Sequence, residues 1–426
     1  MTFIRKKWND PYIVLISVDL LFVVFAFLFD TSSNIANGMR QIFTSRGILI
    51  TDYVDLGGPG AALINAALAG AMGITMMKVS RVTPNGAIIM AIWLNIGFAL
   101  FGKNILNMLP LMAGVWLYSH ARREPFSNYS LTALMSATLA PIVSEIALTD
   151  ILGSSAGSFG GWISGAACGL GIGFIFPSVA AYVVRVHGGY NLYNMGFAGG
   201  LISTIFMASL NSLGITVPTS LYWASGHNLQ MAVFLYALSA LLLTIGFVSC
   251  SRHEIALNLE KLVRHSGRLV TDYYLLYSNS VYVNMALLCI FSTTLVLVAG
   301  GELNGPTIGG ILTITGFGCF GKHLRNISPV LFGAILSSWL GRWDFTSPSS
   351  MLAILFSTCL APISGQFGIL WGILAGFLHV RLVHHVSYLC NGLNLYNNGF
   401  AAGFVVMFLL PLITVFRKEK EDEANI

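Results

Sequence analysis

Two copies of one short motif hold polar residues of the kind that bind small solutes. NLYNMGFAGG at 191–200 and NLYNNGFAAG at 394–403 are identical at eight of ten positions. Asparagine amides donate and accept hydrogen bonds, which suits a neutral polar solute, and their spacing of three would put both asparagines of a copy on one helical face. The amides could equally do no more than tie helices together. The predicted solute-binding residues of the motif are Asn191, Tyr193, Asn194, Gly196, Asn394, Tyr396, Asn397 and Gly399.

A second repeated segment pairs a lysine with an asparagine four residues later. GFALFGKNILNMLPLMAG at 97–114 and GFGCFGKHLRNISPVLFG at 316–333 are identical at eight of eighteen positions. Polar residues in apolar segments are costly, so each is a functional candidate. A lysine ammonium group beside glycine could attract an anion or order a solute, but a lysine at a helix end also extends readily to the lipid headgroups. The predicted solute-binding residues here are Lys103, Asn107, Lys322 and Asn326.

Four prolines occupy matching places in these apolar segments. Pro110 and Pro329 follow the repeated asparagines by three residues, and Pro141 and Pro362 lie in two LAPI sequences. A proline inside an apolar segment breaks or kinks a helix. Broken helices are tolerated at membrane depth where they line a cavity. The paired prolines therefore indicate either a lined cavity or packing kinks.

Glu145 is the acidic residue that is the best candidate for proton coupling, because it lies near the end of an apolar segment where the other copy has Gln366. The sequence has no Walker loop, no HExxH and no Ser/His/Asp order, and its six cysteines show no CxxC spacing. The histidines lack the spacing of metal ligands. We therefore expect no enzymatic activity, no metal and no cofactor.

The composition requires these residues to be positioned by membrane helices. Of the 426 residues, 55% are hydrophobic and 9% are charged, and the mean hydropathy is +0.76. A soluble domain has about a quarter of its residues charged. The apolar runs are continuous and long enough for helices, which need roughly 20 residues to cross a bilayer, whereas β-barrel strands alternate apolar and polar residues. The sequence therefore predicts an all-α integral membrane protein.

The repeated motifs divide the chain into a first membrane repeat at 1–215 and a second at 216–426. The order of the matches is the same in both halves, starting with the TDY sequences at 51–53 and 271–273. Each half contains about seven apolar segments. They are predicted at 11–29, 59–77, 86–102, 106–119, 130–147, 158–186 and 191–212, and at 229–249, 281–300, 304–321, 327–341, 350–364, 367–388 and 393–416.

An odd number of crossings in each half would insert the second copy upside down, and the charges support this. With the N-terminus in the cytoplasm and every segment crossing, all but five of the 22 lysines and arginines fall on cytoplasmic ends, as the positive-inside rule expects. Two re-entrant segments in each half would leave five crossings, which is still odd. The exceptions are Arg40, Arg46, Lys103, Arg342 and Arg381. We therefore predict two inverted repeats, the architecture of many transporters.

The same charges predict the orientation and the partners of the protein. We expect the N- and C-termini to lie in the cytoplasm. The polar linker at about 250–280 is predicted to be a cytoplasmic amphipathic connector that lies on anionic lipid. The net charge of +5 is spread between apolar runs and forms no nucleic-acid-binding stripe. The expected partners are membrane lipid, a small polar solute and, as an open option, further copies of the chain in a homo-oligomer.

Short motifs resemble those of known membrane families. Gly189-Tyr190-Asn191 followed by Gly196 is similar to the Gly-Tyr/Phe-Asn-x4-Gly signature of urea transporters, and FGKN-x-x-N resembles the segments that precede it there and in sodium-pumping quinone reductase membrane subunits. Those proteins are inverted repeats with half-helices along the solute path, so the resemblance implies that fold here. The covalent-flavin signature of the quinone reductase subunits is absent. Over nearly its full length the chain most resembles a bacterial multipass family known only by a domain-of-unknown-function label. This resemblance implies a location in the bacterial inner (plasma) membrane.

Two functions of different classes follow from these observations. The first is a channel or facilitated transporter for a small polar solute, either urea-like and neutral or a small anion, along a path between the repeats. The alternative is a non-catalytic membrane subunit or scaffold of a larger complex, for which a redox complex is one option. A polar path between the repeats favours transport, whereas a dry interface favours the scaffold.

Overall fold

The computed structural model describes residues 8–151, 153, 155–341 and 343–416, which fold into α-helices and short 3-10 helices (η). The first half contains α2 (Pro11–Phe29), α3 (Ser32–Phe43), α4 (Tyr53–Gly57), α5 (Pro59–Val79), α6 (Gly86–Phe98), α7 (Ile105–Arg122), η1 (Phe126–Asn128), α8 (Ser130–Ser136), η2 (Ala137–Leu139), α9 (Ala140–Leu148), α10 (Phe159–His187) and α11 (Asn194–Ser212). The second half contains α12 (Asn228–Ser249), α13 (Arg252–Leu262), α14 (Tyr273–Tyr277), η3 (Ser278–Ser280), α15 (Val281–Val298), α16 (Gly305–Gly316), η4 (Phe317–Cys319), α17 (Leu324–Leu340), α18 (Pro348–Ser357), η5 (Thr358–Leu360), α19 (Ala361–Phe367), α20 (Ile369–Val386), η6 (Ser387–Leu389) and α21 (Asn397–Phe416).

Each of the fourteen predicted segments lies in helical structure, and the all-α membrane class is confirmed; the segments at 130–147 and 350–364 each contain two α-helices joined by a 3-10 turn. Among the described residues, ten helical stretches are long and apolar enough to cross a membrane, five in each half. The remaining predicted segments correspond to α6, α7, α16 and α17. Helices α6 and α16 have only 13 and 12 residues, whereas a crossing needs about 20. None of these four helices is among the candidate spans, so the described residues contain five candidate crossings in each half rather than seven.

Two of the four paired prolines follow a break in a predicted apolar segment, and the other two lie inside unbroken helices. Pro141 and Pro362 sit in the first turn of α9 and α19, directly after the 3-10 turns η2 and η5. Pro110 and Pro329 lie inside α7 and α17, which continue past them without a break. The helix breaks near the repeated lysines instead lie before these two helices, between Phe98 and Ile105 and around 320–323.

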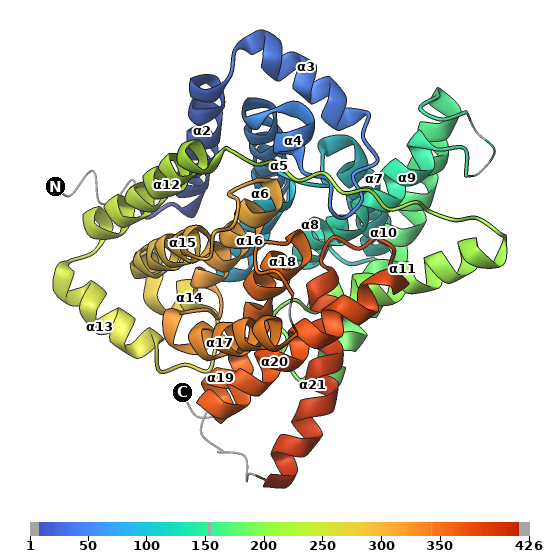
Figure 1. The fold of residues 1–426 in the computed structure, drawn as a ribbon. Coiled ribbons are helices and arrows are strands. Elements are labelled where there is room, and N and C mark those ends of the chain that lie inside the picture. Colours follow the sequence, from blue (N-terminus) through green and yellow to red (C-terminus); the bar gives the residue numbers. More distant parts are fainter. Residues whose placement is uncertain (1–7, 152, 154, 342, 417–426) are drawn as a thin grey trace.

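The helices pack so that the two halves share one centre (Figure 1). Within the halves, α7 packs along α10 and α17 packs along α20; between the halves, α6 packs against α16 and α11 against α21. Helices α2 and α12 lie together at one edge of the molecule, where the rings of Phe22 and Phe234 are 4.8 Å apart. Helix α13 lies in the predicted polar linker. Large apolar side chains such as Phe159 are exposed on the outer helices, which is the surface that lipid contacts.

Two aspartates show how the halves are joined. Asp52 caps α4 and also accepts a hydrogen bond of 3.0 Å from the backbone N–H of Gly305, the first residue of α16. Asp272, its repeat counterpart, caps α14 and accepts one of 3.1 Å from Gly86, the first residue of α6. Carboxylates stabilise helix N-termini by accepting from unpaired N–H groups. Each half therefore positions the short central helix of the other.

Candidate functional site

The repeated lysines reach across the centre to the tyrosines of the NLYN motifs. The Nζ atom of Lys103 donates a hydrogen bond of 2.6 Å to the hydroxyl of Tyr396 and lies 4.5 Å from the centre of its ring. In the same way, Lys322 donates one of 2.7 Å to Tyr193 and lies 4.5 Å from that ring. Each pair joins one half to the other. We call them the crossed lysine–tyrosine pairs.

The other contacts of the two lysines are with neutral groups. Lys103 also donates to Oδ1 of Asn95 at 2.9 Å, and Lys322 donates to Oγ1 of Thr358 at 2.8 Å. Both lysine side chains are fully buried. The ion pairs found among the described residues, Arg46–Glu145, Arg122–Glu124 and Arg264–Glu260, do not include either lysine. A buried ammonium group without a carboxylate is costly, and among the described residues neither lysine has a carboxylate within ion-pair distance.

The lysines are positioned by a tight turn after each short central helix. The backbone N–H of Lys103 donates to the carbonyl of Phe98 at 3.2 Å, and that of Lys322 donates to Phe317 at 2.9 Å. The residues before them, Gly102 and Gly321, have φ angles of 87° and 100°. Glycine adopts such positive φ angles without steric cost. The glycine in each GK sequence is therefore explained by the turn.

Two asparagines that the sequence analysis did not single out hold these turns. Nδ2 of Asn65 in α5 donates to the carbonyls of Ala99 and Lys103 at 2.6 and 2.7 Å. Nδ2 of Asn284 in α15 donates to those of Gly318 and Lys322 at 2.7 and 2.8 Å. The two asparagines are 219 residues apart, as are the two lysines. That shared spacing was the signal that could have identified them.

The first asparagine of each NLYN motif joins the two halves. Nδ2 of Asn191 donates to the carbonyl of Gly399 at 2.9 Å, and Nδ2 of Asn394 donates to that of Gly196 at 3.1 Å. At Gly196 a Cβ atom would clash with the backbone of the opposite motif. The prediction that the asparagines of a motif share a helical face was wrong, because α11 begins at Asn194 and α21 at Asn397.

The second asparagine of each motif faces its own half. Asn194 contacts Nε2 of His187 at 2.7 Å through Oδ1 and donates to the carbonyl of Ala180 at 3.2 Å. Nδ2 of Asn397 donates to Oγ of Ser387 at 2.7 Å. The four motif asparagines thus do not form a single cluster. The tyrosines between them occupy the centre instead.

The repeated asparagines after the lysines lie in helix caps. Oδ1 of Asn107 accepts a hydrogen bond of 2.8 Å from the backbone of Asn104, and its Nδ2 donates to the carbonyl of Gly102 at 3.0 Å. Asn326 makes the equivalent bonds with His323 and Gly321, at 3.0 and 2.9 Å. The structure places both amides beside the lysine turns and outside the lining of the central cavity.

Aromatic rings fill most of the space between the crossed pairs. We define the central aromatic cluster as Phe98, Tyr193, Phe317, Phe356 and Tyr396. Its ring centres lie 4.4 Å apart for Phe98–Tyr396, 5.5 Å for Phe98–Phe356, 6.1 Å for Tyr193–Phe356 and 5.2 Å for Tyr193–Phe317. Four of the rings line a central cavity of about 10 Å³, which is enough for one water molecule.

A larger cavity of about 310 Å³ adjoins the central one. The two share Phe356, Leu395 and Asn398 as wall residues. The larger cavity extends to residues that are exposed at the surface, including Leu221 and Tyr388. Its wall also includes Asn397. A solute entering from that side would therefore meet the central aromatic cluster at the end of the cavity.

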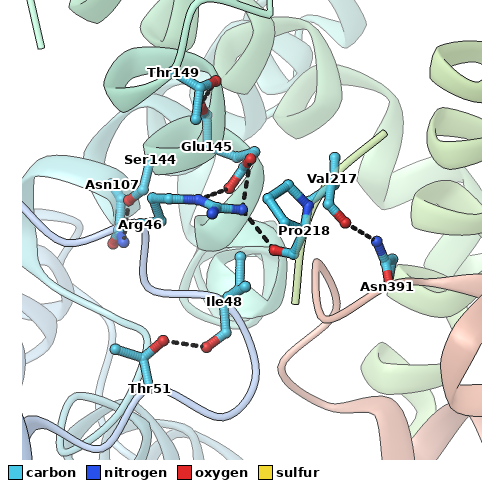
Figure 2. A network of polar contacts seen from close by, with 10 residues as sticks. All are labelled: Arg46, Ile48, Thr51, Asn107, Ser144, Glu145, Thr149, Val217, Pro218 and Asn391. Carbon is cyan, nitrogen blue, oxygen red and sulfur yellow. Dashed lines mark hydrogen bonds and ion pairs between the residues drawn. The ribbon is translucent and has the colours of Figure 1, made fainter. Parts of the chain in front are cut away.

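Glu145, the predicted candidate for proton coupling, lies in an ion pair away from the centre. Its carboxylate accepts hydrogen bonds of 2.7 and 2.8 Å from the guanidinium group of Arg46 (Figure 2). Burial raises the cost of such a carboxylate unless it is paired, and Arg46 supplies the pair. Among the described residues, no group of three or more histidine, cysteine, aspartate or glutamate side chains is placed to hold a metal ion.

These features define a multipass α-helical membrane protein with two buried lysines at a centre shared by its two halves. The family model described as "Protein of unknown function (DUF1576)" matches residues 31–212 and 251–415, and the chain belongs to this family. No curated protein and no solved structure matches the chain. The likeness to urea transporters therefore rests on the motif residues alone.

Proposed function

We propose that this membrane protein is a transporter that passes a small polar solute between two inverted repeats. Five candidate spans in each half support an inverted second half, because an odd number of crossings reverses the direction of insertion. The reciprocal contacts, such as Asn191 with Gly399 and Asn394 with Gly196, are those expected of a two-fold relation. We place the protein in the bacterial plasma membrane with both termini in the cytoplasm, and we propose no enzymatic role.

The crossed lysine–tyrosine pairs are the observation that carries this proposal. Lys103 and Lys322 are buried, and in the part of the chain that the structure describes they have no carboxylate partner. A bound anion would supply the missing charge, and the hydroxyls of Tyr193 and Tyr396 would supply further hydrogen bonds. The centre therefore favours a small anion over a urea-like neutral solute.

The volumes of the cavities favour a carrier over an open channel. The central cavity is about 10 Å³ and the adjoining one about 310 Å³. Passage would require the rings of the central aromatic cluster to move apart, after a solute has entered from one side. Inverted repeats allow this by rocking one half against the other around a fixed site.

Uptake into proteoliposomes tests the proposal. The purified chain is expected to give saturable uptake of labelled formate or nitrate at a rate at least tenfold above that of protein-free liposomes. Uptake of urea is expected to be slower, because urea cannot compensate the charge of the lysines. If every solute in a panel of small anions and amides enters at the protein-free rate, the transport proposal is wrong.

The tight centre is also the observation that favours the alternative, a scaffold subunit of a larger complex. A central cavity that holds about one water molecule is close to a dry interface. Under this alternative, liposomes with the protein would show no uptake. The chain would instead co-purify with fixed partner subunits from its native membrane.

A further inference from the structure

The first repeat contains a buried carboxylate near one end of α9, held by the loop that precedes α4 (Figure 2). Nε and Nη2 of Arg46 donate to Glu145 at 2.7 and 2.8 Å, and Nη2 also donates to the carbonyl of Pro218 at 2.8 Å. The side chain of Glu145 is 1% exposed and that of Arg46 is 27% exposed. In the first half, the carboxylate of Glu145 is therefore the anion that pairs with Arg46.

The second repeat lacks both members of this pair. The offset of 220 that relates Asp52 to Asp272 relates Arg46 to Ser266, and the offset of 221 that relates the LAPI sequences relates Glu145 to Gln366. Neither replacement carries a charge. The second half therefore has no carboxylate at the position that matches Glu145.

A surface cavity of about 360 Å³ lies beside these positions, and its wall includes His265 and Gly365, which precede Ser266 and Gln366 in the chain. Its basic and hydroxyl lining consists of Arg264, His265, His323, Arg325, Ser328 and Ser364. Among the described residues that line it, none is acidic. Arg264 does pair with Glu260, but both side chains are more than half exposed, and exposed pairs of this kind contribute little.

The cavity lies at the start of a candidate membrane span. Helix α20, a candidate membrane span, begins at Ile369, which lines the cavity and is 66% exposed. The next residue, Leu370, is 80% exposed. An exposed apolar surface next to a basic cavity suits a molecule that combines an anionic head with an apolar chain. A cavity of this size is also larger than a single inorganic phosphate requires.

We propose that this cavity binds a phosphate-bearing anion, specifically the headgroup of an anionic phospholipid. Arginine side chains match the geometry of phosphate oxygens and would bind them with charge-assisted hydrogen bonds. The lipid phosphate would lie against Arg264 and Arg325, and the acyl chains would lie along Ile369 and Leu370. This site is separate from the proposed solute path.

Native mass spectrometry of the full chain in detergent tests this proposal. Phosphatidylglycerol is titrated in one arm, zwitterionic phosphatidylethanolamine in a second and inorganic phosphate in a third. Phosphatidylglycerol is expected to bind at least tenfold more tightly than phosphatidylethanolamine. The double variant Arg264→Gln/Arg325→Gln is expected to weaken that binding about tenfold or more, whereas Arg40→Gln/Arg185→Gln, which removes the same charge from exposed positions elsewhere, should leave it unchanged.

Gln366→Glu is the second variant, and it restores a carboxylate at the position equivalent to Glu145. It should also weaken the binding of phosphatidylglycerol, because the new charge repels the phosphate. Competition by inorganic phosphate at millimolar concentration would support an anion site that free phosphate shares. Equal binding of both lipids, or binding that neither variant changes, would overturn the proposal.

Discussion

Replacing both central lysines, Lys103→Met/Lys322→Met, is expected to reduce solute uptake about 100-fold or more. Methionine keeps the length of the side chain and its contact with the tyrosine ring but removes the ammonium group. A hydrogen bond to a charged group contributes about 1.5–3 kcal/mol, and each 1.4 kcal/mol changes affinity tenfold. Because two such groups act on one solute, the loss should be large. It is measured as initial uptake by proteoliposomes.

The control for this experiment is Lys78→Met, because Lys78 is exposed on α5 and lies 5.1 Å from the ring of Tyr12, away from the centre. Solute uptake by the Lys78→Met variant should equal that of the unchanged chain. The double variant should remain folded, since an apolar side chain replaces a buried charge that has no acidic partner. If the folded double variant takes up solute at the normal rate, the lysines do not belong to the solute site.

Replacing the asparagines that hold the lysine turns, by Asn65→Leu or Asn284→Leu, is expected to destabilise the protein. Each change leaves two buried backbone carbonyls without a donor, at about 1–3 kcal/mol for each carbonyl. We therefore expect each variant to lose about 2–6 kcal/mol of stability. Thermal unfolding in detergent measures the effect as a lower Tm.

An exposed asparagine provides the matched control. Asn211→Leu makes the same substitution near the end of α11, where the side chain is exposed, and surface changes of this kind alter stability by less than about 0.5 kcal/mol. The Asn65 and Asn284 substitutions should also lower the Tm by similar amounts, because the two amides make equivalent hydrogen bonds. Unfolding temperatures equal to that of the Asn211 control would show that the turns do not depend on these amides.

The sequence was sufficient to predict the class, the repeat and the residue types at the centre. Lysine, asparagine, tyrosine and proline recur at matching places in two apolar halves, and hydrophobic composition alone does not produce such matches. The partners of these residues could not be predicted. Lys103 binds Tyr396 and Asn191 binds Gly399, and such contacts between the halves depend on how the whole molecule packs.

The sequence also could not predict which neighbouring segments the polar side chains face. Helix α5 is apolar on all sides, so its pattern does not show that Asn65 faces the turn at Lys103. Because α11 begins at Asn194, Asn191 lies outside the helix, and the two asparagines cannot share a helical face. Arg46 and Glu145 are 99 residues apart in the chain, and no local spacing connects them.

The inverted arrangement of the two halves is the basis of the proposed path, and cysteine labelling from each side of the membrane tests it most directly. Asn128 and Ser349 are both exposed and are related by the offset of 221 between the LAPI sequences. The chain's own cysteines are buried or half-buried, so the unchanged chain serves as the blank for a membrane-impermeant thiol reagent. We expect Ser349→Cys to react in intact cells and Asn128→Cys to react only in inverted membrane vesicles. Labelling of both positions from the same side would contradict the inverted repeat and the path between its halves.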